Sequence, residues 1–326
     1  MMPGIWREIL WLILWAGALG TMTTFALRWL GGDQYLAGRL AGYFMPWLLA
    51  VLLPGLLIAM VAQRKWLALA LGAPIALIVI TYAPLFLPAS EERPPAAALK
   101  VMSYNIWSHN EDMAAAAAVI RREQPDILML QEINSRQLGR LQLLLDDLHP
   151  SGALHIIHDD DLLQAVVSRF PVVPLESLRH RGQAQQARIA TTWGPVTVFN
   201  VHPLRHGGWH HRYRQIVALL KEEVLDEQGP TILAGDFNVN DQTQLYRKIT
   251  RYLRDAHWQA GFGFGFTFPA DASRFYRKYK IPPLIRIDHI FYSPHFLAQN
   301  ARTLQDSGGS DHYPVVAELI PPAIRP

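Results

Sequence analysis

Residues 231–238 read TILAGDFN, so that a short apolar run, Thr231 to Ala234, is followed at once by Gly235-Asp236-Phe237-Asn238. A short apolar run that ends in glycine and polar residues is typical of a buried β-strand. Three other runs end in the same way: residues 100–106 (KVMSYNI) at Asn105, residues 126–131 (DILMLQ) before Glu132, and residues 196–201 (VTVFNV) before His202. Polar groups at the ends of adjacent central strands converge on one edge of a rigid sheet. The pattern therefore predicts one site built from residues that are far apart in sequence.

Other segments of the same region alternate between helix and strand. Helical patterns cover residues 112–124, 135–148 and 209–226, and further strands are expected at residues 163–167, 287–292 and 315–319. We find no internal repeat and no glycine-rich phosphate loop of the nucleotide-binding kind.

The oxygen-bearing side chains at the strand ends suit a hard cation. Hydrolysis of a phosphate ester requires that the negative charge of the phosphoryl group be neutralised. Mg²⁺, with Mn²⁺ as an alternative, suits this task because it prefers carboxylate and amide oxygens. Glu132 and Asn105 provide such ligands, and Asp311 can complete the metal shell.

The remaining polar residues suit proton transfer and phosphate binding. Asp236 with Asn238 fits a pair that orients the attacking water, with Asp236 as base or metal ligand and Asn238 as phosphate donor. His202 and His312 can donate to phosphate oxygens or exchange protons near neutral pH. Asp288 is a natural orienting partner for His312, whereas we can name no carboxylate partner for His202.

Seven short motifs follow one another over about residues 100–319. They are Ser103-Tyr104-Asn105-Ile106-Trp107, Gln131-Glu132, Ser168-Arg169-Phe170-Pro171, Asn200-Val201-His202, Gly235-Asp236-Phe237-Asn238, Arg286-Ile287-Asp288-His289-Ile290 and Ser310-Asp311-His312-Tyr313-Pro314-Val315. Each motif is weak alone, but in this order they resemble the motifs of the endonuclease/exonuclease/phosphatase superfamily, also called DNase I-like.

The resemblance implies an α/β fold, a four-layer α/β sandwich in which two mixed sheets are flanked by helices. It implies that Glu132 is the main Mg²⁺ ligand, helped by Asn105, with Asp311 on the metal side. Asp236, Asn238, His202, His312 and Asp288 are then the catalytic residues. Arg169, Arg212 and Arg286 are expected to contact the substrate, Arg212 as part of an Arg-x-x-Gln pattern with Gln215. The sequence departs from the family at Gln164, where a small residue is usual.

The N-terminal third of the chain has a different character. Three apolar stretches, at about residues 9–27, 40–62 and 66–87, each approach the roughly 20 residues that cross a bilayer as a helix. Tryptophan and tyrosine stand near their ends, as in interfacial belts. A cleaved signal peptide is the alternative for the first stretch alone. We therefore expect residues 1–87 to form a bundle of about three transmembrane helices, residues 88–98 a proline-rich linker, and residues 99–326 the catalytic domain.

The orientation in the membrane is indicated only by charge. Arg64 and Lys65 occupy a tight turn without acidic residues, which favours the cytoplasmic side for this turn. The N-terminus is then cytoplasmic as well, and three crossings place the catalytic domain outside. This predicts an integral protein of the inner or plasma membrane with an extracytoplasmic catalytic domain.

Composition narrows the possible substrates and partners. The chain contains no cysteine, which excludes disulfides, thiolate catalysis and cysteine-ligated zinc. After residue 96 there are 24 basic and 23 acidic residues, a balance that gives little support for a nucleic-acid partner. Residues 274–280 are rich in basic and aromatic side chains, which would suit anionic headgroups as well as a solvated loop. No obligate protein partner is inferred.

Three functions remain open at this level. The first is a phosphodiesterase or phosphomonoesterase that acts on a lipid or another membrane-associated substrate. The second is a membrane-bound nuclease with the same chemistry. The third is a non-catalytic membrane scaffold, against which the complete set of polar strand-end residues argues.

Overall fold

The computed structural model describes residues 4–87, 98–148, 154–175, 177–178, 183–203 and 208–321. The chain divides into two units, Met1–Leu87 with Gln242–Gln244, and Pro88–Asp241 with Leu245–Pro326. The linker expected at residues 88–98 lies, apart from residue 98, outside the described residues.

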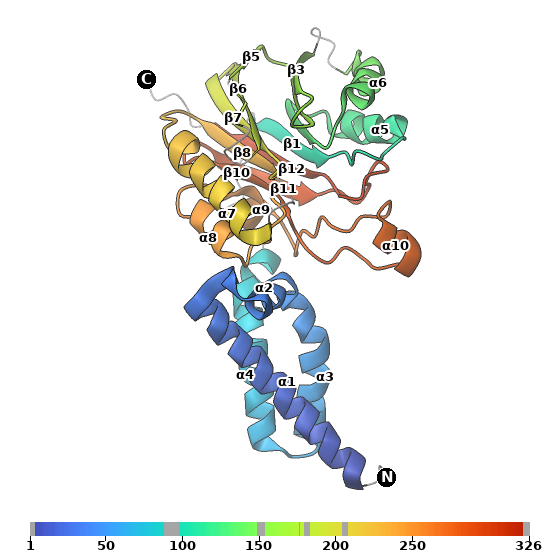
Figure 1. Cartoon of the computed structure of the whole chain (residues 1–326), viewed down its shortest axis with the longest axis vertical. Helices are drawn as coiled ribbons and strands as arrows, with labels where there is room; N and C mark the ends of the chain where they lie inside the picture. Colours follow the sequence, from blue (N-terminus) through green and yellow to red (C-terminus); the bar gives the residue numbers. More distant parts are fainter. Residues whose placement is uncertain are drawn as a thin grey trace. The chain divides into compact units, whose positions relative to one another are not determined.

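The larger unit contains two six-stranded sheets (Figure 1). The first has the strand order β11-β12-β1-β2-β4-β3, and the second has the order β5-β6-β7-β8-β10-β9. The strands are β1 (Leu99–Asn105), β2 (Ile127–Gln131), β3 (His155–Asp159), β4 (Gln164–Ser168), β5 (Val172–Pro174), β6 (Ala184–Thr191), β7 (Gly194–Val201), β8 (Thr231–Asp236), β9 (Arg254–Asp255), β10 (Asp288–Tyr292), β11 (Leu297–Thr303) and β12 (Val315–Ile320).

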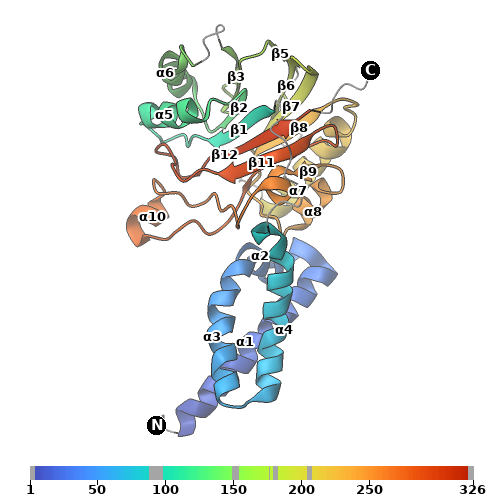
Figure 2. The ribbon, with the colours of Figure 1, turned by 180° about the vertical axis from the view of Figure 1, so that it is seen from behind.

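Helices cover the outer face of each sheet, as both ribbon views show (Figures 1 and 2). Helices α5 (Met113–Glu123) and α6 (Ser135–Leu145) pack on the first sheet. Helix α7 (Gly208–Leu219), its π-helical extension at Leu220–Val224, and α8 (Gln244–Ile249) pack on the second. Two short helices, α9 (Ala256–Ala260) and α10 (Arg274–Tyr279), complete the described elements of this unit. The predicted four-layer α/β sandwich is therefore confirmed.

Side-chain alternation along the strands explains where the polar residues go. In β1, Leu99 and Val101 belong to the core between the sheets, whereas Met102 and Tyr104 face the helices. The inward face ends in a polar residue, Asn105, because successive side chains of a strand point to opposite faces. Strands β2, β7 and β8 follow the same rule, and their inward faces end at Gln131, Asn200 and Asp236. The polar groups therefore face one another at one edge of the sandwich.

A buried amide pair joins the two sheets just below this edge. Gln131 Nε2 of β2 donates to Asn200 Oδ1 of β7 at 2.7 Å, and Asn200 Nδ2 donates to the carbonyl oxygen of Leu130 at 2.9 Å. Both side chains are fully buried, so these bonds satisfy groups that would otherwise be costly to bury. Glu132 directly follows Gln131, and His202 stands two residues after Asn200, so the amide pair links the two segments that carry them.

The N-terminal unit consists of apolar helices. Helices α1 (Gly4–Gly31) and α4 (Lys65–Tyr82, extended to Phe86 by a 3₁₀ turn) are long and apolar enough to cross a membrane. Many of their side chains are exposed apolar groups, such as Leu12, Trp66 and Ile80. A soluble surface rarely carries so much contiguous apolar area.

The second apolar stretch is not one continuous helix. It forms α2 (Leu36–Tyr43) and α3 (Leu48–Val61), separated by a 3₁₀ turn at Met45–Trp47 and bent by 72°. Pro46 lies in this turn, where its ring prevents a continuous helix. Helix α3 alone spans about 21 Å, less than the roughly 30 Å hydrocarbon core. Among the described residues of this unit, two helices are thus long and apolar enough to cross a membrane, or three if the bent pair counts as one.

Candidate active site

The polar strand ends meet as the sequence predicted. Asn105 ends β1, and Glu132 follows β2, which runs parallel to β1. His202 follows β7, and Asp236 ends β8, which runs parallel to β7. Asp288 opens β10, which runs antiparallel to β8, so it reaches the same edge from the other direction. Gly235 is required here, because it has a φ of 148° and a Cβ atom would lie 1.9 Å from the carbonyl oxygen of Val201.

Asp236 occupies the centre of this group. Its Oδ2 atom accepts a hydrogen bond from Asn105 Nδ2 at 3.1 Å. The same oxygen lies 3.7 Å from His202 Nε2 and 3.7 Å from His312 Nε2. The side chain is fully buried. One carboxylate oxygen is thus shared by an amide donor and two imidazoles.

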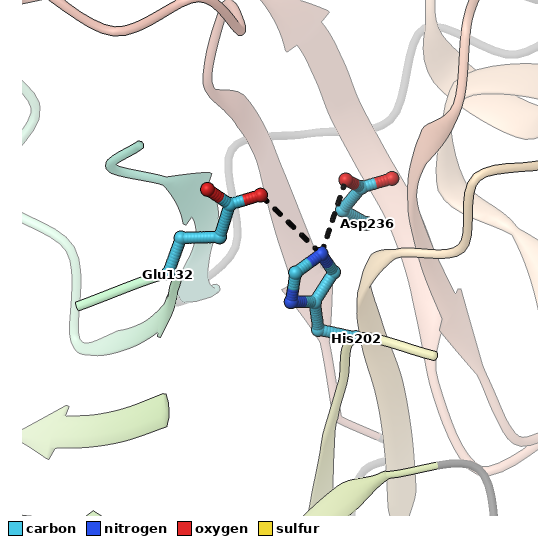
Figure 3. A group of neighbouring side chains, drawn as sticks. All are labelled: Glu132, His202 and Asp236. Atoms are coloured by element: carbon cyan, nitrogen blue, oxygen red, sulfur yellow. Dashed lines mark ion pairs between the residues drawn. The ribbon is translucent and has the colours of Figure 1, made fainter. Parts of the chain in front are cut away.

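Glu132 lies on the other side of His202 from Asp236, as Figure 3 shows. His202 Nε2 is 3.5 Å from Glu132 Oε1, which also accepts from Asn105 Nδ2 at 3.3 Å. The second oxygen, Oε2, accepts from the backbone N–H of Ser108 at 3.3 Å. Glu132 has a left-handed φ of 53°, which a non-glycine residue adopts only at a cost. The two carboxylates, Glu132 and Asp236, are the partners of His202 that the sequence did not identify.

His312 is held by Asp288. Its Nδ1 atom donates to Asp288 Oδ2 at 2.9 Å, and both side chains are buried. Burial opposes the charged imidazolium, but the negative charges of Asp288 and Asp236 outweigh this and raise the pKa of His312 to about 10. Ser310 fixes the loop before β12, because its Oγ donates to the carbonyl oxygen of Asn105 at 2.6 Å and accepts from the N–H of His312 at 3.1 Å.

Among the residues that the structure describes, two groups of side chains are compact enough to hold a metal ion. They are Glu132 with His202 and Asp236, and Asp236 with Asp288 and His312; in each group the ligand atoms lie within 4.8 Å of one another. The Nε2 atoms of His202 and His312 are buried without a hydrogen-bond partner among the described residues. Two imidazole nitrogens therefore point at the same carboxylate with capacity to bind another group.

Two residues expected as metal ligands take different positions. The side-chain oxygen of Asn105 accepts from the N–H of Trp107 at 2.9 Å, so its nitrogen faces the two carboxylates. In this arrangement Asn105 joins Glu132 and Asp236 rather than offering an oxygen. Asp311 belongs to neither metal-sized group among the described residues, and its carbonyl oxygen accepts from the N–H of Ala270.

Asn238 and Arg212 are linked. The N–H of Asn238 donates to Asp236 Oδ1 at 2.9 Å, and Arg212 Nη1 donates to the carbonyl oxygen of Asn238 at 3.0 Å. Asn238 has a φ of 53°, a conformation that asparagine tolerates better than most residues. Arg212 therefore positions the loop after β8, in addition to any contact with substrate.

The structure places Arg169 away from this group of side chains. It follows Ser168, which pairs with Ile127 at the start of β2, whereas Glu132 follows the end of β2. Its Nε atom pairs with Asp126 Oδ1 at 2.8 Å. Arg169 thus lies at the opposite edge of the sheet, and a substrate contact at this site does not fit its position.

Arg286 is buried and paired with a carboxylate. It is 3% exposed, and its Nη1 atom pairs with Asp255 Oδ2 at 2.9 Å. Asp255 also accepts from the hydroxyl of Tyr246 at 2.7 Å. Burial raises the pKa of Asp255, but the charge of Arg286 outweighs this and holds it well below its usual range. Arg286 is therefore part of a buried ion pair, because its charge is taken up by Asp255.

Comparisons with known proteins agree with this geometry. Residues 102–312, more than half of the chain, match the model of the "Endonuclease/Exonuclease/phosphatase family". No curated protein matches the chain significantly. Among solved structures, an endonuclease/exonuclease/phosphatase from Bacteroides vulgatus is similar with a TM-score of 0.55 and 21% identity, covering 69% of this chain and 100% of its own.

Two other similar structures have more specific names. A mannosyl-6-phosphatase from Bacteroides thetaiotaomicron has a TM-score of 0.53 and 22% identity, covering 68% of this chain and 100% of its own. A humanized TDP2 of D. rerio has a TM-score of 0.54 and 16% identity, and the match covers 69% of this chain and 100% of the TDP2 chain. At these identities the likeness shows the fold. Together with the match over residues 102–312, it establishes that the chain belongs to the endonuclease/exonuclease/phosphatase family, whose members hydrolyse phosphoesters.

Proposed function

We propose that this protein is a membrane-anchored, divalent-metal-dependent phosphoesterase that acts on a lipid or another membrane-associated phosphoester, either a diester or a monoester. The observation that carries the proposal is the shared position of Asp236 Oδ2, which lies within 3.7 Å of Asn105, His202 and His312. A buried carboxylate surrounded in this way has a chemical role that packing alone does not explain.

The donor set fits Mg²⁺ or Mn²⁺. Glu132 would be the main ligand of the ion, because hard cations prefer carboxylate oxygens. When bound, the ion would neutralise the phosphoryl charge and lower the pKa of water. Asn105 would keep the two carboxylates at their spacing through its hydrogen bonds to both.

The protein's own residues account for the remaining chemistry. Asp236 accepts the proton of the attacking water, and Asn105 and the N–H of Asn238 hold its carboxylate in place. His312, kept charged by Asp288, donates from Nε2 to the anionic phosphoryl oxygens. His202 lies between the two carboxylates and binds the phosphoryl group or protonates the leaving oxygen.

Exposed apolar helices support the membrane anchor. Helix α1 is 28 residues long, which corresponds to about 42 Å and is enough to cross a bilayer. The guanidinium of Arg64, in the turn between α3 and α4, lies 5.1 Å from the ring of Trp11, in the N-terminal half of α1. The turn and the N-terminus then share one side of the membrane, which agrees with three crossings. We accordingly propose a cytoplasmic N-terminus and an extracytoplasmic catalytic domain.

Helix α10 supports a substrate held in a bilayer. Its exposed residues include Arg277 and Lys278, followed by Lys280, with Tyr279 58% exposed beside them. Exposed basic residues next to an aromatic ring suit an anionic membrane surface.

The proposal is tested by a substrate screen with the full chain in Mg²⁺. Phospholipids, sphingomyelin and phosphoinositides are presented in vesicles that contain the protein, and duplex DNA is offered in parallel. We expect hydrolysis of at least one lipid, and a weaker rate when Arg277, Lys278 and Lys280 are all changed to glutamine. Cleavage of DNA alone would support the nuclease, and no hydrolysis of any ester would support the scaffold.

A further inference from the structure

A polar cavity of about 440 Å³ opens beside the candidate site. Its walls come from the segment after β1 and from the N-terminal half of α6. They include Ser108, Asn110, Arg136, Gln137 and Arg140. A volume of this size accommodates a phosphate or carboxylate group with part of its carrier.

Ser108 connects the cavity to the candidate site. It lines the cavity, and both its N–H and its hydroxyl donate to Glu132 Oε2, at 3.3 and 3.4 Å. A molecule whose phosphoryl group lies at Glu132 and Asp236 therefore has the cavity as a neighbouring space.

The wall between the two sites is rigid. Gln137 Nε2 of α6 donates to the carbonyl oxygens of Trp107 at 3.1 Å and Asn110 at 2.9 Å. The side chain of Gln137 also accepts from the N–H of Asn134 and completes the capping box of α6. The segment that carries Ser108 is thus fixed to the helix that carries the two arginines, and their spacing is preset.

Arg136 and Arg140, which line the cavity, differ from the arginines of the neighbouring helix in their pairing. They stand four residues apart on α6, so their side chains share one face of the helix. Neither forms an ion pair or hydrogen bond with any residue that the structure describes. On the neighbouring helix α5, by contrast, Arg121 pairs with Asp147 and Arg122 pairs with Asp306.

We infer that this cavity is a subsite for a second anionic group of the substrate, a phosphate or carboxylate other than the one that is hydrolysed. Two guanidinium groups on one wall can each offer paired N–H donors to such an anion. Glu111 also lines the cavity, so its charged residues Glu111, Arg136 and Arg140 leave one net positive charge, which favours an anionic occupant. The inference rests on the proposed function and specifies its substrate class as one with two separated anions.

The test uses the full chain with excess Mg²⁺, while it hydrolyses whichever of p-nitrophenyl phosphate or bis(p-nitrophenyl) phosphate it accepts. Fructose 1,6-bisphosphate and fructose 6-phosphate are compared as competitors. We expect the bisphosphate to inhibit at a concentration at least about tenfold lower, the scale of one charge-assisted contact. In the Arg136→Gln/Arg140→Gln variant this preference should disappear, and in the double lysine variant it should partly return.

Arg121→Gln/Arg122→Gln serves as the matched control, because these arginines are on α5 and already paired. This variant should keep the preference for the bisphosphate. Glycerophosphoinositol 4-phosphate and a 5′-phosphorylated dinucleotide then distinguish a lipid headgroup from a nucleic acid as the source of the second anion. Equal inhibition by the two fructose phosphates in the unmodified protein would overturn the inference, as would a preference that survives Arg136→Gln/Arg140→Gln. Failure to hydrolyse either chromogenic ester would instead contradict the proposed function.

Discussion

Asp236 and Asp288 lie directly opposite each other on the neighbouring antiparallel strands β8 and β10. Burial raises the pKa of Asp288, and repulsion from the buried carboxylate of Asp236 on the same face of the sheet raises it further. His312 lies between them, 2.9 Å from Asp288 and 3.7 Å from Asp236, and its positive charge offsets the repulsion. The imidazole is thereby fixed with Nε2 toward the site.

Loss of the Asp236 carboxylate or of the His312 imidazole should remove most of the catalytic activity. We predict that Asp236→Asn and His312→Ala each lower kcat by on the order of 10² or more, the scale of one acid–base group. Asp147→Asn is the control, because that carboxylate is exposed and pairs with Arg121 on the surface. Steady-state kinetics measures kcat for each variant, and circular dichroism checks that each variant is folded. A folded Asp236→Asn protein with full activity would show that the assignment is wrong.

Arg286 should matter for stability and not for substrate binding. Arg286→Met leaves Asp255 buried without its cation, and breaking a buried pair in this way costs about 3–5 kcal/mol. Thermal unfolding of the full chain should show a clearly lower Tm. A normal Tm together with a raised KM would instead indicate that Arg286 contacts the substrate.

We predict that the folded protein loses stability in mild acid because the buried ring of His257 resists protonation. Burial, helped by the charge of Arg286, lowers the pKa of His257 to about 4, below its unfolded value of roughly 6.5. The folded state favours the neutral ring, so the contribution to stability is complete above about pH 6.5 and is lost as the pH falls toward 4. The difference corresponds to about 3 kcal/mol.

The variant His257→Gln isolates this contribution. Glutamine can still donate to the carbonyl oxygen of Gly263, as His257 Nε2 does at 2.9 Å, but it does not titrate. Between pH 7 and pH 4.5 the Tm of the unmodified chain should fall more steeply than that of the variant. Parallel Tm curves would rule out the assignment.

The absence of cysteine makes the membrane topology directly measurable. Single cysteines replace Ile5 at the start of α1, Ala62 at the end of α3, and the 82% exposed Leu143 on α6. Three crossings predict that an impermeant thiol reagent added outside intact cells labels only Leu143→Cys. Labelling of Ala62→Cys from outside, with Leu143→Cys protected, would mean that α2 and α3 form a re-entrant pair.

The strands that the sequence revealed are the interior ones. Strands β1, β2, β4, β7, β8, β10 and β12 were expected, and each has neighbours on both sides in its sheet. The edge strands β3, β5, β9 and β11 were missed, together with β6. Edge strands face solvent and are often short or polar, so they lack the apolar run on which recognition depends. Strand β6 (AQQARIAT) was missed because its buried glutamines interrupt the apolar pattern.

The site residues divide in a similar way. Those that continue a strand's inward face, such as Asn105 and Asp236, could be placed from the sequence because the strand fixes their direction. The arginines could not, because a long side chain pairs with whichever carboxylate the tertiary structure brings near. Asp255, the partner of Arg286, stands 31 residues away, and nothing local to Arg286 indicates it. The contact of Gly261 and Gly265 with the ring of His257, where a Cβ atom would come within 2.5 Å, is likewise set by the tertiary structure.

Metal dependence is the most direct test of the central claim, that this edge of the sandwich hydrolyses phosphoesters. The full chain is assayed on bis(p-nitrophenyl) phosphate and p-nitrophenyl phosphate after treatment with excess chelator, and then with Mg²⁺ or Mn²⁺ restored; Glu132→Gln is measured in parallel. The account predicts that chelation abolishes turnover, that either ion restores it, and that Glu132→Gln needs a higher ion concentration for the same rate. Full turnover in excess chelator would contradict it.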